Sequence, residues 1–262
     1  MKYKWIVVIC VVTLLVGCLA VGCTAKEEEP QEVIGIIGAM DVELDIIKAK
    51  TDVIKVSTYN DMEFCQGTLM GNPVVIVKCG MGKVNAGVCA YTLINTFGCT
   101  KIINTGVAGA LDERLDIGDF VVSTEAVQHD FDVEHIGFVK GEIPYTGKVA
   151  FEADSELRAK AVAAVKASAP DRQVLEGRVC TGDQFIHTAE QKERITANFG
   201  GLCCEMEGGA VAQVCYLNDT PFVIIRTVSD KVNETTALDY AVFERQAAAI
   251  CAQAVLTMIQ NM

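Results

Sequence analysis

Six apolar runs of strand length recur along the chain, and each ends in a polar or glycine-rich stretch. Polar residues do not alternate with apolar ones inside these runs, which is typical of strands covered on both faces. The predicted strands are residues 33–37, 73–78, 101–104, 120–123, 174–180 and 221–227. Runs of this kind favour a largely parallel sheet, because helices then cover both of its faces.

Stretches with helical spacing of apolar residues separate the predicted strands. They are residues 41–49, 83–96, 154–169, 190–198, 207–217 and 239–259. Asp154 and Asp239 stand at the start of two of them and are expected N-caps. Strands that alternate with helices predict a single three-layer α/β domain. Segment 130–149 is too long for a simple connection, and long ordered loops are often functional.

The N-terminus has a composition of its own. Lys2 and Lys4 precede a short apolar stretch that ends in small residues, so residues 1–23 have the pattern of an export signal. An uncleaved transmembrane anchor is the alternative, because the apolar stretch is nearly long enough to span a bilayer. In either case the folded part is expected outside the cytoplasm, held at a membrane on the periplasmic or cell-surface side.

Two cysteines in this leader are candidate lipidation sites. Cys18 and Cys23 each end a sequence that resembles the bacterial lipobox, in which the cysteine is diacylated and becomes the new N-terminus. Residues 24–32 would then be a polar tether, and residues 33–262 a single folded domain. The chain is therefore predicted to be a membrane-anchored lipoprotein.

Charge and cysteine usage limit the possible partners. A formal net charge of −12 argues against nucleic acid, because phosphate neutralisation needs clustered Lys and Arg. Nine of the twelve cysteines follow the leader, mostly in apolar stretches and without a CxxC pair, so we expect buried thiols instead of disulfides or a metal site. His129, His135 and His187 are scattered and lack ligand spacing. No metal or organic cofactor is expected.

The most informative polar segment joins the first predicted strand to the first predicted helix. Residues 38–43 read GAMDVE. This place is the carboxyl edge of the sheet, where open α/β sheets bind their ligands. A phosphate-binding loop would present backbone amides with Lys or Arg there. The segment presents carboxylates, so it is better suited to hold a water molecule than a phosphate.

Further polar or glycine-rich motifs follow predicted strands or begin predicted helices. Each is weak evidence alone, because a glycine-rich turn after a strand is usually only a turn. In chain order they read KCGMGKVNA (78–86), NTGVAG (104–109), TGDQFI (181–186), CEME (204–207) and RTVSD (226–230). Their joint occurrence in this order is specific.

Together with GAMDVE, these motifs resemble the nucleoside phosphorylase/hydrolase superfamily, and specifically the 5′-methylthioadenosine/S-adenosylhomocysteine nucleosidases. The resemblance extends from residue 33 to the C-terminus. It implies a three-layer α/β/α sandwich around a mixed, twisted sheet, and a homodimer whose partner helps to form each active site. It also implies hydrolysis of the N-glycosidic bond of the two named nucleosides, which releases adenine and a thioribose product without a cofactor.

The resemblance assigns the reaction to two carboxylates. Cleavage passes through an oxocarbenium-like state that is attacked by water. Glu43 matches the residue that activates this water, and Asp230 matches the acid that protonates the purine. The acid must be a carboxyl group kept partly protonated by an apolar site. Without the resemblance, Glu43 would be read as balancing the helix dipole and Asp230 as an N-cap or a solvated turn residue.

Other positions match residues that contact the sugar in this family. Glu207 corresponds to the acceptor for the ribose hydroxyls, since a carboxylate can accept two hydrogen bonds from a diol. Met206 corresponds to the residue that packs on the sugar, and Arg226 to the residue that orients the carboxylate and the water. Glu205 is expected only to cap the helix that follows it.

The remaining matches concern the base and the 5′ substituent. The adenine contacts correspond to Phe185, Ile186 and Ser229. The apolar pocket for the thioether corresponds to Met40, Met81 and Tyr240, and from the partner subunit to Val133, Ile136 and Pro144. Ile136 and Tyr240 depart from the family's usual aromatic residues at these positions. Val107 departs more seriously, because it stands where serine is usual and supplies no hydroxyl. This departure bears on rate or substrate preference.

Three alternatives stay open at this point. The chain could be a nucleosidase for another adenosine derivative, such as deoxyadenosine or aminofutalosine. It could be a phosphorylase, which would need phosphate for cleavage. It could also be an exported nucleoside-binding lipoprotein without turnover. The intact set of Glu43, Glu207 and Asp230 counts against the last, because a pure binder has no need of a proton donor.

Overall fold

The computed structural model describes residues 32–231 and 237–262, with the backbone alone for 237–241. The predicted export signal, both candidate lipidation sites and most of the predicted tether therefore lie outside the described residues. The side chain of Tyr240 lies outside them as well.

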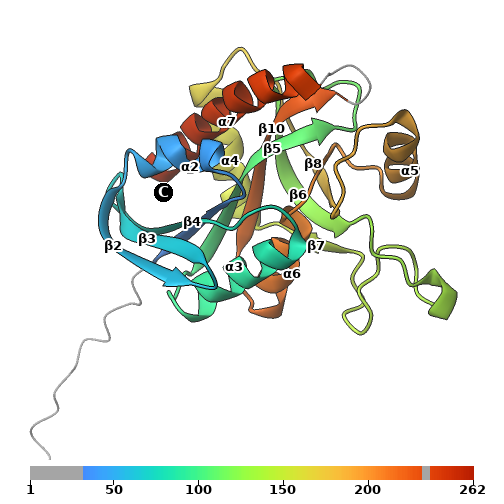
Figure 1. The fold of residues 1–262 in the computed structure, drawn as a ribbon, viewed down its shortest axis with the longest axis horizontal. Helices are drawn as coiled ribbons and strands as arrows, with labels where there is room; N and C mark the ends of the chain where they lie inside the picture. The colour runs from blue at the N-terminus through green and yellow to red at the C-terminus, as the bar shows by residue number, and fades with distance from the viewer. Residues whose placement is uncertain (1–31, 232–236) are drawn as a thin grey trace, which may run out of the picture. The chain divides into compact units, whose positions relative to one another are not determined.

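Ten strands of the described chain form one mixed sheet (Figure 1). They are β1 (Ile34–Gly38), β2 (Asp52–Tyr59), β3 (Met62–Leu69), β4 (Asn72–Lys78), β5 (Lys101–Ala110), β6 (Phe120–Gln128), β7 (Ala150–Glu152), β8 (Val174–Thr181), β9 (Cys203–Glu205) and β10 (Phe222–Lys231). Parallel pairing joins β4, β1, β5 and β10, in that order. The antiparallel β2–β3 hairpin extends the sheet beyond β4. On the other side β10 pairs with β6, and β8 and β9 lead back to β5, so this half of the sheet closes on itself.

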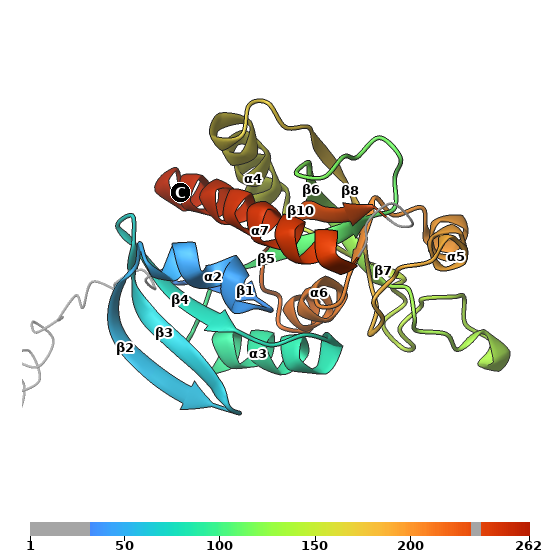
Figure 2. The same cartoon turned by 45° about the horizontal axis from the view of Figure 1, so that its top comes forward.

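Helices cover both faces of the sheet (Figure 2). They are α2 (Asp41–Lys48), α3 (Lys83–Asn95), α4 (Ser155–Ser168), α5 (Ala189–Phe199), α6 (Gly208–Leu217) and α7 (Ala237–Gln260), with a short 3-10 turn η1 (Glu134–Ile136). Helices α2, α4 and α7 share one apolar core with the sheet, and α3 and α6 share the core of the opposite face. The predicted three-layer α/β fold is confirmed.

Two predicted local features have clear outcomes. Asp154 caps α4, since its Oδ1 accepts the backbone N–H of Leu157 at 2.8 Å. The prediction for Asp239 was wrong, because α7 already begins at Ala237. Among the described residues, α7 contains one stretch, Val242–Gln260, that is long and apolar enough to cross a membrane. Half of it is buried inside the fold, as expected of a helix in the protein core.

The structure extends two predicted strands through the polar motifs at 104–109 and 226–230, which the sequence pattern placed at or after the strand ends. Both segments continue strands, β5 and β10, which pair with each other over this length. The glycines serve close packing, because a Cβ at Gly106 would overlap the carboxylate of Glu43, and one at Gly109 would crowd that of Asp230. These two glycines of β5 therefore make room for the carboxylates of Glu43 and Asp230.

Four strands were not predicted, namely β2, β3, β7 and β9. Most of β2 is exposed at the sheet edge, so it carries no continuous apolar run. Strand β3 is largely buried between β2 and β4, but polar residues interrupt its apolar ones. The short strands β7 and β9 depend on partners that are distant in sequence, as β9 does on β5 and β8. The nine cysteines of the described chain are all buried free thiols, which confirms the reading of them as small hydrophobic residues.

Candidate active site

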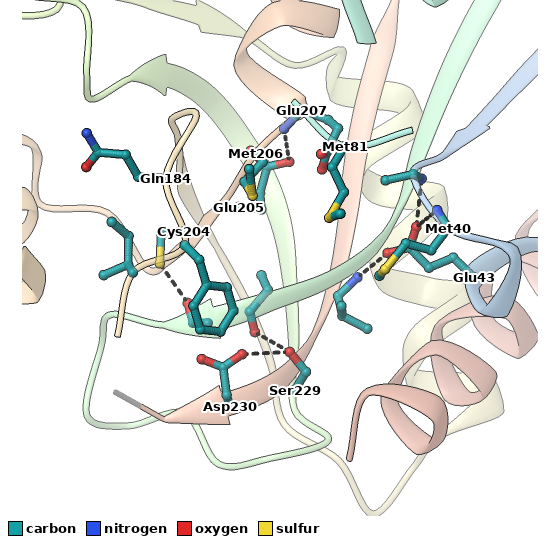
Figure 3. A pocket seen from close by; sticks show the side chains of 16 residues that line it. Met40, Glu43, Met81, Gln184, Cys204, Glu205, Met206, Glu207, Ser229 and Asp230 are labelled. Atoms are coloured by element: carbon teal, nitrogen blue, oxygen red, sulfur yellow. Dashed lines mark hydrogen bonds between the residues drawn. The ribbon is translucent and has the colours of Figure 1, made fainter. Parts of the chain in front are cut away.

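A pocket opens where β1, β5 and β10 end (Figure 3). Together with the solvent-filled space at its mouth, it has a volume of about 570 Å³. The lining residues are Ala39, Met40, Glu43, Met81, Val107, Ala108, Gly109, Gln184, Phe185, Ile186, Cys204, Glu205, Met206, Glu207, Ser229 and Asp230. The polar side chains are mainly carboxylates, and no Lys, Arg or His is among the lining residues of the described chain.

Glu43 lies at the floor of this pocket in the first turn of α2. Its Oε2 accepts the backbone N–H groups of Ala39 and Met40, at 2.7 and 2.9 Å, and its Oε1 accepts that of Val107 on β5, at 3.1 Å. Burial raises the pKa of Glu43, although Arg226 and these N–H donors favour its charged form. The carboxylate does balance the start of α2, and it also reaches β5. The Val107 contact uses the backbone, so it does not need the serine hydroxyl that is missing there.

Asp230 and Ser229 enter the pocket from β10 as sequence neighbours. Adjacent side chains of a regular strand point to opposite faces. The pairing of β10 with β5 shifts register between Val228 and Asp230, and such a bulge re-aims side chains. Ser229 then donates to Oδ1 of Asp230 at 2.8 Å. Burial raises the pKa of Asp230, and this hydrogen bond only partly opposes the rise.

Glu207 stands immediately before α6 and is also buried. Its Oε1 accepts the backbone N–H of Gly82 at 2.9 Å, and its Oε2 lies 3.7 Å from the guanidinium of Arg226. Burial and the nearby Glu205 raise the pKa of Glu207 to about 7, against the effect of Arg226. The carboxylate therefore changes its charge in the neutral range.

Arg226 lies behind the pocket wall and is almost completely buried. Its guanidinium donates to the carboxylate of Glu205 and, at 2.7 Å, to Oδ1 of Asn104. Burial lowers the pKa of Arg226, but Glu205, Glu207 and Glu43 together raise it above its usual range. A permanently charged guanidinium thus faces three carboxylates from behind the site.

Apolar side chains line the rest of the pocket. Ile186 is buried, whereas Phe185 is 54% exposed and its ring stacks with that of His187. Met40 and Met206 are partly buried, and Met81 is 61% exposed at the mouth. The structure therefore brings together the residues predicted for the base, for the sugar and, in Met40 and Met81, for the 5′ substituent.

The predicted contacts from a partner subunit are outside this pocket. Val133, Ile136 and Pro144 belong to the long segment 130–149, and Ile136 is 72% exposed. None of the three is among the pocket-lining residues of the described chain. The prediction concerns the pocket of a second subunit, and it stays a prediction.

Comparison with known proteins places this geometry in a family. Residues 33–260 match the family described as the phosphorylase superfamily. A 5′-methylthioadenosine/S-adenosylhomocysteine nucleosidase of Staphylococcus carnosus is 39% identical over 231 residues, which are 87% of this chain and 100% of that protein. The chain belongs to the 5′-methylthioadenosine/S-adenosylhomocysteine nucleosidase family.

Solved structures of this nucleosidase family and of a related hydrolase share the fold. The nucleosidase from Neisseria meningitidis, in complex with methylthio-immucillin-A, is 33% identical and has a TM-score of 0.83, covering 88% of this chain and 100% of that one. The futalosine hydrolase of Helicobacter pylori is 29% identical with a TM-score of 0.82, covering 88% of this chain and 98% of that one.

Several residues of the site did not stand out in the sequence as more than local features. Glu205 does cap α6, accepting the N–H groups of Glu207 and Gly208 at 3.1 and 2.7 Å, but it also binds Arg226. The backbone N–H of Gly82 donates to the carboxylate of Glu207, and the side-chain oxygen of Asn104 accepts from the guanidinium of Arg226. The motifs KCGMGKVNA and NTGVAG that contain Gly82 and Asn104 were visible as patterns, but these contacts join positions more than a hundred residues apart.

Proposed function

We propose that this domain hydrolyses the N-glycosidic bond of 5′-methylthioadenosine and S-adenosylhomocysteine and releases adenine. The observation that carries the proposal is the set of three buried carboxylates, Glu43, Glu207 and Asp230, in a pocket whose described lining holds no cationic side chain. A phosphate co-substrate would need cationic side chains to balance its charge. Water needs only a carboxylate to orient it and take its proton.

The chemistry follows from the position of each carboxyl group. Asp230, whose pKa is raised by burial, gives a proton to the imidazole-ring nitrogen of the purine, and the electron pair of the broken glycosidic bond stays with adenine. Water attacks the anomeric carbon and passes a proton to Glu43. Glu207 accepts hydrogen bonds from the ribose hydroxyls, and Arg226 holds Glu207 from behind.

The first prediction concerns phosphate. Purified protein is expected to release adenine from methylthioadenosine equally fast in phosphate-free and phosphate-containing buffer, because the lining carries no cation for the anion. Adenine and the sugar product are measured by chromatography, and the same assay is run with S-adenosylhomocysteine, deoxyadenosine and aminofutalosine. Cleavage that requires phosphate, with a ribose phosphate as product, would assign the chain to the phosphorylases instead.

The second prediction is a pH dependence set by Glu207. Only its ionised form accepts two hydrogen bonds from the ribose diol, and its pKa is about 7. We therefore expect kcat/KM to fall as the pH drops through about 7, with the loss in KM because the group binds the sugar. Glu207→Gln should lower kcat/KM and move this acid limb, because Glu43 is then the carboxylate left to titrate. An acid limb that stays at the same pH in the variant would contradict the assignment.

We also propose that the domain is exported and anchored in a membrane through a lipid on Cys18 or Cys23. The support is the sequence pattern of residues 1–23, with its basic start, apolar stretch and lipobox-like ends. Labelling with a fatty-acid analogue in cells is expected to mark the unaltered protein and to be lost in Cys18→Ser or Cys23→Ser. Label retained in the variant that lacks both cysteines would show that neither Cys18 nor Cys23 carries the lipid, and would contradict the proposal.

We propose in addition that the chain forms a homodimer. Helix α3 exposes Val84, Val88 and Tyr91 at helical spacing on one face, and it begins directly after Met81 at the pocket mouth. Such an apolar stripe beside a binding site is typical of a subunit interface. Light scattering is expected to give the mass of two chains, and a monomer with full activity would contradict the proposed contribution of Val133, Ile136 and Pro144.

A further inference from the structure

Glu205 makes more contacts than a helix cap needs. Its Oε2 accepts the backbone N–H groups of Glu207 and Gly208 and also a guanidinium N–H of Arg226. Its Oε1 accepts the hydroxyl of Thr181, which in turn accepts the backbone N–H of Gly209 at 2.6 Å. One buried carboxylate thus joins β8, β9, β10 and the start of α6.

These contacts leave Glu205 poorly placed to bind substrate. The residue is 7% exposed, and both of its oxygens already accept hydrogen bonds from the protein. Two of the three groups that donate to Oε2 are linked to Glu207: its own backbone N–H, and the guanidinium of Arg226, which faces its carboxylate. Any effect of Glu205 on the reaction therefore has to pass through Glu207 and Arg226.

The position of Arg226 depends on few partners. Two hydrogen-bond acceptors hold its guanidinium among the described residues, Glu205 and the Oδ1 of Asn104, while its Nε is buried without a partner. Glu207 lies at the longer distance of 3.7 Å. Without the charge of Glu205, the guanidinium would be free to turn towards Glu207 or Glu43 and close an ion pair with a carboxylate that substrate needs.

We propose that Glu205 is a positioning residue for ribose binding, which fixes the backbone of Glu207 and keeps Arg226 from neutralising the carboxylates that face the substrate. This inference rests on the proposed function. In the CEME motif, the sequence pointed to Glu207 alone as a residue of the site, and the proposal adds Glu205.

The charges around Glu207 supply a way to test this role. Glu205, Glu43 and Arg226 are the charged groups that face it from β9, α2 and β10, and Glu205 raises its pKa. Removing the charge of Glu205 alone should therefore lower the pKa of Glu207 and move the acid limb of kcat/KM to lower pH. A residue with a purely structural role would change stability without moving this limb.

The decisive variant is Glu205→Gln, which keeps the shape of the side chain. Its amide oxygen can still accept from Arg226 and the two backbone N–H groups, and its NH₂ can donate to the Thr181 hydroxyl. We expect kcat/KM for methylthioadenosine to fall by about 10- to 100-fold at neutral pH, as for loss of a charged hydrogen bond, mainly through KM. We also expect an acid limb at lower pH and unchanged binding of free adenine, because adenine lacks the sugar.

Thr181→Val is the matched control. It removes a hydrogen bond to Glu205 in the same core but leaves the carboxylate charge. We expect a lower melting temperature with the acid limb in its original place. If Glu205→Gln shows the same unshifted limb and no larger loss of kcat/KM than this control, Glu205 is structural and the proposal is wrong.

A second variant covers the case in which Glu205→Gln does not fold. Glu205→Asp keeps the charge and shortens its reach, so it is expected to lose kcat/KM while the acid limb stays close to its original pH. Unchanged kcat/KM in a folded Glu205→Asp protein would overturn the positioning role. Hydrolysis by the unaltered protein is measured separately, so failure of this inference leaves the proposed function standing.

Discussion

Replacing Glu43 by glutamine is expected to remove most turnover while leaving nucleoside binding largely intact. Glutamine has nearly the same shape, but it cannot take a proton from the attacking water, and general base catalysis is worth on the order of 10²–10⁴-fold. The oxygen of the amide can still accept from Ala39 and Met40, and only the bond from Val107 is lost. Adenine release gives kcat, and calorimetry with methylthioadenosine gives the affinity of the inactive variant.

Asp41→Asn is the control for this experiment. Asp41 lies on the same loop, but its side chain is exposed and pairs with Lys78 at 2.8 Å, away from the pocket lining. Its removal should leave turnover close to that of the unaltered protein. Near-normal turnover in Glu43→Gln as well would exclude Glu43 from water activation.

The second large effect is expected from Asp230→Asn. Asparagine cannot give a proton to the departing base, so kcat should fall by about 10²–10⁴-fold. Because burial raises the pKa of Asp230, the unaltered protein should lose activity as the pH rises through that value, and this basic limb should be absent in the variant. Rates of adenine release across the pH range measure both effects.

Asp116→Asn is a suitable control for the acid. Asp116 is an exposed partner of Lys231, the residue that follows Asp230 on β10, and it is not among the pocket-lining residues. Its loss should change neither kcat nor the basic limb. A purified Asp230→Asn protein with the kcat of the unaltered protein would refute the acid role.

A large part of the fold could be predicted because it depends on local pattern. Continuous apolar runs indicated the central strands β1, β4, β5 and β10, since such runs need helices on both faces. Helical spacing and the cap at Asp154 indicated the helices within a few residues. The hairpin β2–β3 was missed because neither strand carries a continuous apolar run: β2 is an exposed edge strand, and polar residues interrupt the buried β3.

The candidate site, too, was predictable in part: its residues could be named from the sequence, but their arrangement could not. The resemblance of its ordered motifs to a known family implied that Glu43, Glu207 and Asp230 serve one active site, and all three line the pocket. The register between paired strands cannot be predicted from a local sequence pattern. The bulge that turns both Ser229 and Asp230 into the pocket arises from the pairing of β10 with β5.

The chain's own sequence determined which chemical groups are available, namely the carboxylates in the motifs at the ends of the predicted strands, and an N-terminal leader with two candidate lipidation cysteines. Tertiary structure decided how these groups act on one another. Burial raises the pKa values of Glu43, Glu207 and Asp230, and Glu205 becomes the centre of a network only when β8, β9, β10 and α6 meet. The physical reason is that desolvation and hydrogen bonding depend on which groups are close in space, and residues far apart in the sequence supply these groups.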